Sequence, residues 1–277
     1  ASSYGNGQSE QNLGRVLNEL SADVVVGTKV RLGPEDMADI KAGVIKSVEA
    51  SLSRMNQSSV DLIQLHNRVA ARRNPDRDLL SVEDVLGPVV DGFQTLQSQG
   101  KIRFYGITGF GETEALLRVI DSGAMYSTQS CYNLINPSAG TPAPAGFDLQ
   151  DFGGLIQRAE AQETGVLVIR VLAAGALTGV NERHPVAAQE VAPMGSSGSY
   201  SEDLSRARAL GFLVEEGHVE NLVEAALRFP LGNSGVSTVL VGYSNTEHLE
   251  QAVRWIDRGQ LPDEALERLP AIWARRD

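Results

Sequence analysis

Cysteine is almost absent from this sequence, which has one, Cys131, in 277 residues. A single cysteine forms no disulfide within the chain, so we expect a reducing compartment and predict a cytoplasmic location. No apolar run approaches the roughly 18 residues that a membrane-spanning helix needs, and no secretory signal peptide is visible. We therefore expect no membrane partner.

Aromatic residues and positive charge are also scarce. Aromatics make up 5% of the chain, and 35 acidic residues outnumber 24 basic ones, for a net charge of -11. An acidic chain disfavours nucleic acid as a partner. A hydrophobic share of 42%, with little of it aromatic, is typical of helices packed on a parallel sheet rather than of a β-sandwich. No set of metal ligands is predicted.

Strand-like and helix-like segments alternate along the chain. The expected strands are 23–29, 60–66, 101–107, 125–130, 165–171 and 238–241. The expected helices are one opened by Pro34 with its apolar face at Ile40, Val44, Val48 and Leu52, and those at 82–98, 112–122, 152–162, 204–215, 219–229, 246–257 and 262–275. Segments 133–147 and 180–199 are expected to be irregular. The alternation predicts a parallel sheet, as a barrel or as an open doubly wound sheet. No G-x-G-x-x-G follows a strand, which disfavours a Rossmann fold.

Three polar side chains stand at points where catalytic groups of parallel barrels are found. Lys29 and His66 end the first two expected strands, and Tyr4 precedes the turn-forming Gly5-Asn6-Gly7. The carboxyl ends of barrel strands carry catalytic residues. Taken singly, each residue is more often a solvated charge, a rim histidine or a packing tyrosine.

Six segments stand in a set order over nearly the whole chain. They are residues 4–10 (YGNGQSE), residues 24–29 (VVVGTK), the segment ending in DLIQLH, the segment QGKIRFYGITGF, LAAGALTG and VSTVLVGYSNTEHLEQA. Together, and in family order, they resemble the aldo-keto reductase superfamily. YGNGQSE resembles the end of its D-T-A-x-x-Y-G-x-G-x-S-E motif, and VVVGTK resembles its strand ending in Thr-Lys. The resemblance implies a (β/α)8 TIM barrel of aldo-keto reductase type, as a single domain over residues 1–277.

The resemblance also implies an enzyme. It predicts an NAD(P)-dependent oxidoreductase that transfers hydride between a nicotinamide cofactor and an aldehyde or ketone, or a sugar or alcohol in the reverse direction. Tyr4 would be the general acid, and Lys29 would favour the ionised phenol. His66 would orient the substrate carbonyl. The small carbonyl or sugar substrate is the only partner expected, and the sequence does not indicate an oligomeric state.

The family's fourth catalytic group is an aspartate that pairs with the lysine. Its motif position falls two residues before Ala1, and the family's first strand, first helix and most of its second strand would also precede Ala1. We therefore expect an N-terminally incomplete barrel, because loss of two strands from eight would leave two unpaired sheet edges.

Cofactor contacts follow from the resemblance alone. The residues implied are Thr108, Gln129, Arg170, Leu172, Gly242, Ser244, Asn245, His248 and Gln251. Thr108 and Gln129 would hold the nicotinamide carboxamide. Arg170 would pair with the pyrophosphate or, alternatively, with an acidic neighbour. Ser244 and Asn245 open a helix whose N-terminus favours anions, although they also serve as ordinary helix caps.

Some positions depart from the family pattern. Gly109 stands where asparagine is frequent, and Ile169 stands where a tyrosine usually stacks on the nicotinamide. His248 and Gly242 replace cations found in NADPH-preferring members, and Ala252 replaces an adenine-binding asparagine. NADP and NAD therefore both remain open as the cofactor.

Arginines after the second strand raise the question of an anionic substrate. Arg68, Arg72 and Arg73 could attract a phosphorylated aldehyde, but we favour solvation or pairing with neighbours such as Asp76 and Asp78. Trp255 and Trp273 are expected to be packing residues.

Two alternatives to an active enzyme remain open. A cofactor-binding regulatory module on the same barrel would need no turnover, and a pseudoenzyme would account for the departures at Gly109 and Ile169 and for the aspartate. Intact Tyr4, Lys29 and His66 favour the enzyme.

Overall fold

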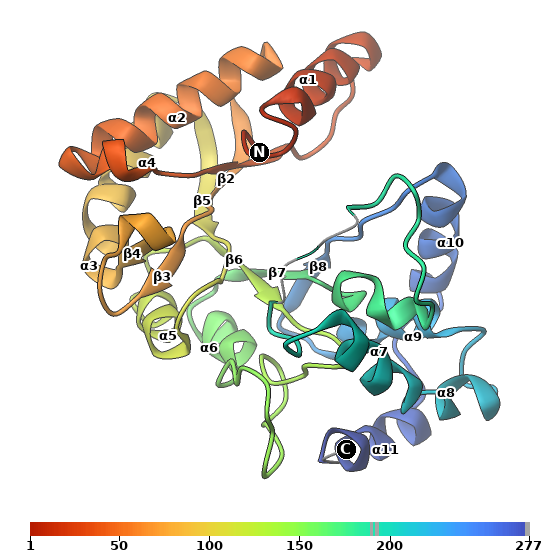
Figure 1. Ribbon diagram of the computed structural model, residues 1–277. Helices are drawn as coiled ribbons and strands as arrows, with labels where there is room; N and C mark the ends of the chain where they lie inside the picture. Colours follow the sequence, from red (N-terminus) through yellow and green to blue (C-terminus); the bar gives the residue numbers. More distant parts are fainter. Residues whose placement is uncertain (189–190, 192–193, 275–277) are drawn as a thin grey trace. The chain divides into compact units, whose positions relative to one another are not determined.

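The computed structural model describes residues 1–188, 191 and 194–274, and its chain divides into two compact units (Figure 1). The first unit holds Ala1–Gln129 with Ala161–Gly165, and the second holds Ser130–Glu160 with Val166–Asp277. Among the described residues, no helix combines the length and the apolar character required to cross a membrane. Each unit is described by itself below.

Parallel strands form the centre of the first unit. They are β1 (Gly27–Val30), β2 (Val60–Leu65), β5 (Ile102–Ile107) and β6 (Ser127–Cys131), paired in that order. β6 runs across the boundary between the two units. The register pairs Val30 with Leu65, Leu65 with Ile107, and Ile107 with Thr128. Val30, Leu65 and Ile107 are fully buried. The register places them side by side on neighbouring strands.

The first strand is shorter than the apolar run in the sequence predicts. It begins at Gly27 rather than at residue 23, and Val24 and Val25 are 57% and 81% exposed. The prediction of a strand over 23–29 was wrong at its start, because an apolar run marks a strand only where a partner covers it.

Helices of the first unit follow the predicted alternation. They are α1 (Gln8–Leu20), η1 (Pro34–Ala38), α2 (Ile40–Met55), η2 (Pro75–Arg77), α3 (Val82–Asp84), η3 (Val85–Val89), α4 (Val90–Ser98) and α5 (Thr113–Asp121). α2 begins at Ile40 because Asp39 caps it, accepting a hydrogen bond from the Ala42 amide at 3.0 Å. The segment predicted at 82–98 changes to a π-helical turn at η3, where Pro88 has no amide hydrogen to donate.

Helix α1 packs against α2 (Figure 1). Gly14 makes this contact possible, because a β-carbon there would lie 2.0 Å from the Met55 carbonyl oxygen. The predicted apolar face of α2 is buried, with Val44 and Val48 both 0% exposed.

A short two-stranded sheet that was not predicted, β3 (Arg68–Ala70) with β4 (Leu79–Ser81), lies in the loop after β2.

The second unit contains the parallel pair β7 (Gly165–Ile169), whose first residue is counted with the first unit, and β8 (Val236–Val239). Its helices are α6 (Leu155–Ala161), η4 (Ala173–Thr178), α7 (Tyr200–Arg208), α8 (Phe212–Glu215), α9 (Leu222–Arg228), η5 (Phe229–Gly232), α10 (Thr246–Ile256) and α11 (Asp263–Trp273). β8 begins two residues before the predicted 238. Arg275, the predicted end of the last helix, and residues 189–190 and 192–193 of the predicted loop lie outside the described residues.

Candidate active site

Tyr4, Lys29 and His66 come from three separate elements of the first unit. Tyr4 lies in the turn before α1, Lys29 lies in β1, and His66 directly follows β2. The His66 amide donates to the Val30 carbonyl at 2.7 Å, as part of the pairing of Val30 with Leu65. Parallel strands therefore bring Lys29 and His66 to the same end of the sheet.

The three side chains lie together. The Lys29 ammonium donates a hydrogen bond to the Tyr4 hydroxyl, with 3.1 Å between Nζ and Oη, and Nζ lies 4.9 Å from the Tyr4 ring centroid. The Tyr4 and His66 rings meet edge to face, with centroids 5.9 Å apart and planes at 83°. Tyr4 is 46% exposed. Among the described residues, no carboxylate is within ion-pair distance of Lys29.

A buried glutamate fixes the helix that follows Tyr4. Glu10 is 1% exposed and accepts hydrogen bonds from Thr28 Oγ1 and Arg54 Nε, both at 2.6 Å. Burial alone would raise the pKa of Glu10, but these two hydrogen bonds and the Arg54 charge outweigh burial and lower it. Thr28 is the neighbour of Lys29, so this network ties the Tyr4 turn to β1. Sequence reasoning did not single out Glu10, although it ends the YGNGQSE segment.

His66 is held in its neutral form. Burial, followed by the positive charges of Lys29 and Arg31, lowers the pKa of His66 to about 4. Near neutral pH the imidazole therefore carries one N–H donor and one acceptor nitrogen. Lys29 and Arg31 then supply the positive charge that acts on His66.

Thr108 directly follows β5, and Gln129 lies in the middle of β6. The Thr108 hydroxyl is fully buried, and its Oγ1 has no hydrogen-bond partner among the described residues. Gln129 is 4% exposed and donates from Nε2 to Gln64 Oε1 at 2.7 Å. An unpaired buried hydroxyl costs free energy unless a ligand pairs with it. Thr108 thus fits a bound group that offers a hydrogen-bonding partner, as a carboxamide does.

Gly109 has a structural reason to depart from the family's asparagine. Its φ is +61°, and a β-carbon there would lie 1.9 Å from the Gln129 carbonyl oxygen. No side chain fits between these strand ends unless the backbone moves.

In the second unit, Arg170 and Leu172 follow β7 at the start of a strained turn. Arg170 has a φ of +57°, and its carbonyl accepts from Asn133 Nδ2 at 2.8 Å. Leu172 precedes η4, in which Ala173 and Ala174 also have positive φ values of 46° and 58°. The Ala173 and Gly175 amides donate to the Arg170 and Leu172 carbonyls at 2.7 and 2.8 Å, which closes the turn.

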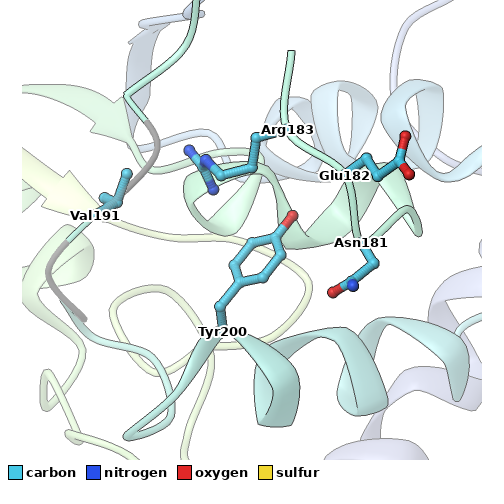
Figure 2. Close-up of a pocket in the computed structure, with 5 residues that line it drawn as sticks. All are labelled: Asn181, Glu182, Arg183, Val191 and Tyr200. Atoms are coloured by element: carbon cyan, nitrogen blue, oxygen red, sulfur yellow. The ribbon is translucent and has the colours of Figure 1, made fainter. Parts of the chain in front are cut away.

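Arg183 braces this turn from a loop that sequence reasoning left unassigned. It donates from Nη1 to the Ala174 carbonyl at 2.7 Å, and its guanidinium lies 5.2 Å from the Tyr200 ring centroid. Figure 2 shows Tyr200 rising from α7 toward Arg183. Both residues line a pocket of about 510 Å³, together with Asn181, Glu182 and Val191.

The remaining predicted cofactor residues lie around the start of α10, also in the second unit. Gly242 and Ser244 follow β8, and Asn245 caps the helix by accepting from the His248 amide at 2.9 Å. The His248 ring lies 5.9 Å from that of His184, and Gln251 Nε2 donates to Glu247 Oε1 at 3.3 Å. These side chains are exposed or half-buried.

The three arginines after β2 are solvated or paired, as the sequence favoured. Arg73 is held by Asp84, with 2.8 Å between Nε and Oδ2, whereas the prediction named Asp76 and Asp78. Arg68 and Arg72 are exposed. Both tryptophans pack as expected: the Trp255 indole donates to Glu220 at 3.2 Å and the Trp273 indole to the Leu134 carbonyl at 2.8 Å.

Comparison with known proteins identifies relatives over almost the whole chain. A model of the aldo/keto reductase family matches residues 1–274. The chain is 27% identical over 280 residues to the L-galactose dehydrogenase of Arabidopsis thaliana, an alignment that covers 97% of this chain and 77% of that protein. It is 28% identical over 294 residues to a putative voltage-gated potassium channel subunit beta of Schizosaccharomyces pombe, again covering 97% and 77%.

A solved structure shows the fold. The holo form of the aldo-keto reductase AKR11C1 from Bacillus halodurans superposes with a TM-score of 0.69 at 19% identity, covering 98% of this chain and 80% of that one. The predicted fold, a (β/α)8 barrel of aldo-keto reductase type, is confirmed, although the pairings of the described strands do not close into a ring. The chain belongs to the aldo/keto reductase family.

Proposed function

We propose that this protein transfers hydride between NAD(P) and a small aldehyde or ketone, or a sugar or alcohol in reverse, with Tyr4 as the general acid. Family membership supports NAD(P)-dependent oxidoreduction in general. The observation that carries the finer proposal is the contact of Tyr4 with Lys29 and His66 in the first unit.

Tyr4 is arranged to give up its proton. Its oxygen accepts a hydrogen bond from the Lys29 ammonium, so the hydroxyl hydrogen is left to point at a substrate carbonyl oxygen. When the proton moves to that oxygen, the phenolate that remains is stabilised by the same ammonium. Lys29 is therefore proposed to assist Tyr4 without itself exchanging a proton.

His66 is proposed to orient the carbonyl. Because burial and nearby cations lower its pKa to about 4, it is neutral at physiological pH and donates a hydrogen bond without competing as an acid. A second donor beside the phenol fixes the carbonyl oxygen and strengthens as charge develops on it.

The nicotinamide cofactor supplies or accepts the hydride when it is bound. Thr108 and Gln129 are proposed to hold its carboxamide, since the buried Thr108 hydroxyl lacks a partner among the described residues. The proposed contacts to the rest of the cofactor are Arg170, Leu172, Gly242, Ser244, Asn245, His248 and Gln251. The positions of His248 and Gly242 lack the lysine or arginine that NADPH-preferring members of the family have, so we propose use of either NAD or NADP.

The test is cofactor oxidation by purified protein with a panel of aldehydes and ketones. Tyr4→Phe is expected to lower kcat by about 100-fold or more, the usual contribution of a general acid. Tyr126→Phe is a matched control, because Tyr126 is also 46% exposed and also lies in the first unit. Full activity in Tyr4→Phe would exclude the assigned acid.

A non-catalytic cofactor-binding module is the second candidate. The resemblance to a protein described as a putative potassium channel subunit favours testing it. NADPH binding can be measured by quenching of tryptophan fluorescence. Binding of NADPH that no carbonyl then oxidises would support this module or a pseudoenzyme over the enzyme.

A further inference from the structure

Arg31 stands one residue past the end of β1. Side chains alternate along a strand, so Thr28 and Val30 point to one face and Lys29 and Arg31 to the other. The exposures agree, since Thr28 and Val30 are 5% and 0% exposed while the Arg31 side chain is 53% exposed. Arg31 therefore shares its face with the lysine that contacts Tyr4.

The pairing of β1 with β2 ends beside Arg31. The His66 amide donates to the Val30 carbonyl at 2.7 Å, and the Thr108 amide donates to the Leu65 carbonyl at 3.0 Å. The Leu32 amide donates to the Asn67 side chain at 2.8 Å, so Arg31 lies between a residue bonded to His66 and a residue bonded to Asn67. Arg31 thus lies beside the candidate carbonyl-binding histidine. Its charge is among those that lower the pKa of His66, after burial and Lys29.

A small buried network holds the base of the Arg31 side chain. Asn67 is 2% exposed and donates from Nδ2 to Asp78 Oδ1 at 2.8 Å. The same oxygen accepts from Arg31 Nε at 3.1 Å. Asn67 is itself fixed by two hydrogen bonds to the backbone of Leu32, at 2.8 and 2.9 Å. The guanidinium is therefore oriented before any ligand arrives.

The outer end of Arg31 remains available. Its two terminal nitrogens have no hydrogen-bond partner among the described residues, whereas Arg73 has both Nε and Nη2 on Asp84. A guanidinium fork binds a carboxylate or phosphate through two parallel hydrogen bonds. Arg31 thus offers an anion two nitrogens, whereas Arg73 is held by Asp84.

We propose that Arg31 selects carbonyl substrates that carry an anionic group, a carboxylate or a phosphate, near the carbonyl carbon. This inference rests on the function proposed above and names its substrate class. The carbonyl oxygen would lie between Tyr4 and His66, and the anionic group would reach the free end of Arg31. The binding is a ground-state contact, so it acts mainly on KM rather than on kcat.

Matched substrate pairs test the inference. One pair is 4-carboxybenzaldehyde with its methyl ester, and the other is glyceraldehyde 3-phosphate with glyceraldehyde, so the two sources of negative charge are separated. The readout is the ratio of kcat/KM between the charged and neutral members, measured on one preparation. This ratio does not depend on how much of a variant is folded.

Arg31→Gln is expected to lower the ratio about five- to tenfold for at least one pair, a modest factor because the side chain is half exposed. Arg31→Lys should give an intermediate ratio, since it keeps the charge and loses the fork. Arg103→Gln is the control: it removes one positive charge from the same unit at the opposite ends of the strands, and the ratio should not change.

Two results would overturn the inference in distinguishable ways. If the neutral and charged members react equally well, or if Arg31→Gln keeps the wild-type ratio for both pairs, Arg31 does not select the substrate while the proposed function stands. If no carbonyl in the set oxidises NADH or NADPH, the proposed function fails, and the substrate class fails with it.

Discussion

The protonation state of His66 gives the sharpest quantitative prediction. Its pKa lies near 4, against 6.5 for an ordinary histidine, because of burial first and then the charges of Lys29 and Arg31. At pH 6.5 we expect about 0.3% of His66 to be protonated, where an ordinary histidine would be half protonated. The neutral donor proposed for catalysis depends on this difference.

The lowered pKa also affects stability, with a defined sign. Between pH 4 and pH 6.5 the unfolded chain binds the His66 proton and the folded chain does not. The free energy of unfolding therefore rises with pH across this window. The contribution of His66 is fully present above pH 6.5 and is lost as the pH falls from 6.5 toward 4. A shift from 6.5 to about 4 corresponds to about 3 kcal/mol, which partial exposure reduces to about 2 kcal/mol.

Nuclear magnetic resonance can measure the pKa directly. The His66 ring signals, assigned by their loss in His66→Gln, should titrate near pH 4. Lys29→Met and Arg31→Gln should each raise the pKa but leave it below 6.5, because burial, the largest cause, remains. Urea unfolding of wild type and His66→Gln at several pH values isolates the linked stability. A His66 signal that titrates near 6.5 would refute both the burial argument and the neutral donor.

Three further predictions concern residues around the same site. Thr108→Val should change the free energy of unfolding by less than about 1 kcal/mol, because the Thr108 hydroxyl has no partner among the described residues. The same variant should weaken cofactor binding about five- to tenfold in fluorescence titrations. Unchanged binding would remove Thr108 from the proposed site. Gly109→Asn restores the family's usual residue, but should cost about 1–3 kcal/mol in urea unfolding, since its β-carbon would meet the Gln129 carbonyl. Glu10→Gln should cost about 3 kcal/mol in the same assay because it leaves Arg54 without its buried partner, and a loss below about 1 kcal/mol would contradict the role given to this ion pair.

Much of the first unit follows from local sequence pattern. The four-residue spacing of apolar side chains predicts the buried face of α2, and the apolar runs predict the positions of β2 and β5. Lys29 and His66 could be singled out because the end of a strand is visible in the sequence, and parallel strands end at one edge. The contact of Tyr4 with Lys29 across 25 residues could be expected only through the family resemblance.

Local pattern fails where a partner distant in the sequence decides the outcome. Val24 and Val25 look like strand residues, but no neighbouring strand pairs with them in the described structure. Arg73 pairs with Asp84 rather than with Asp76 or Asp78, which are nearer to it in the sequence.

The sequence by itself determined the order of strands and helices and the residue types available for chemistry. Periodicity and capping act over a few residues, so they can be read along the chain. The tertiary structure alone decided that Glu10 is buried against Arg54. It also decided that, among the described residues, the terminal nitrogens of Arg31 and the hydroxyl of Thr108 have no hydrogen-bond partner. Burial and pairing are properties of surfaces that meet only after the chain has folded, and no local spacing encodes which surfaces those will be.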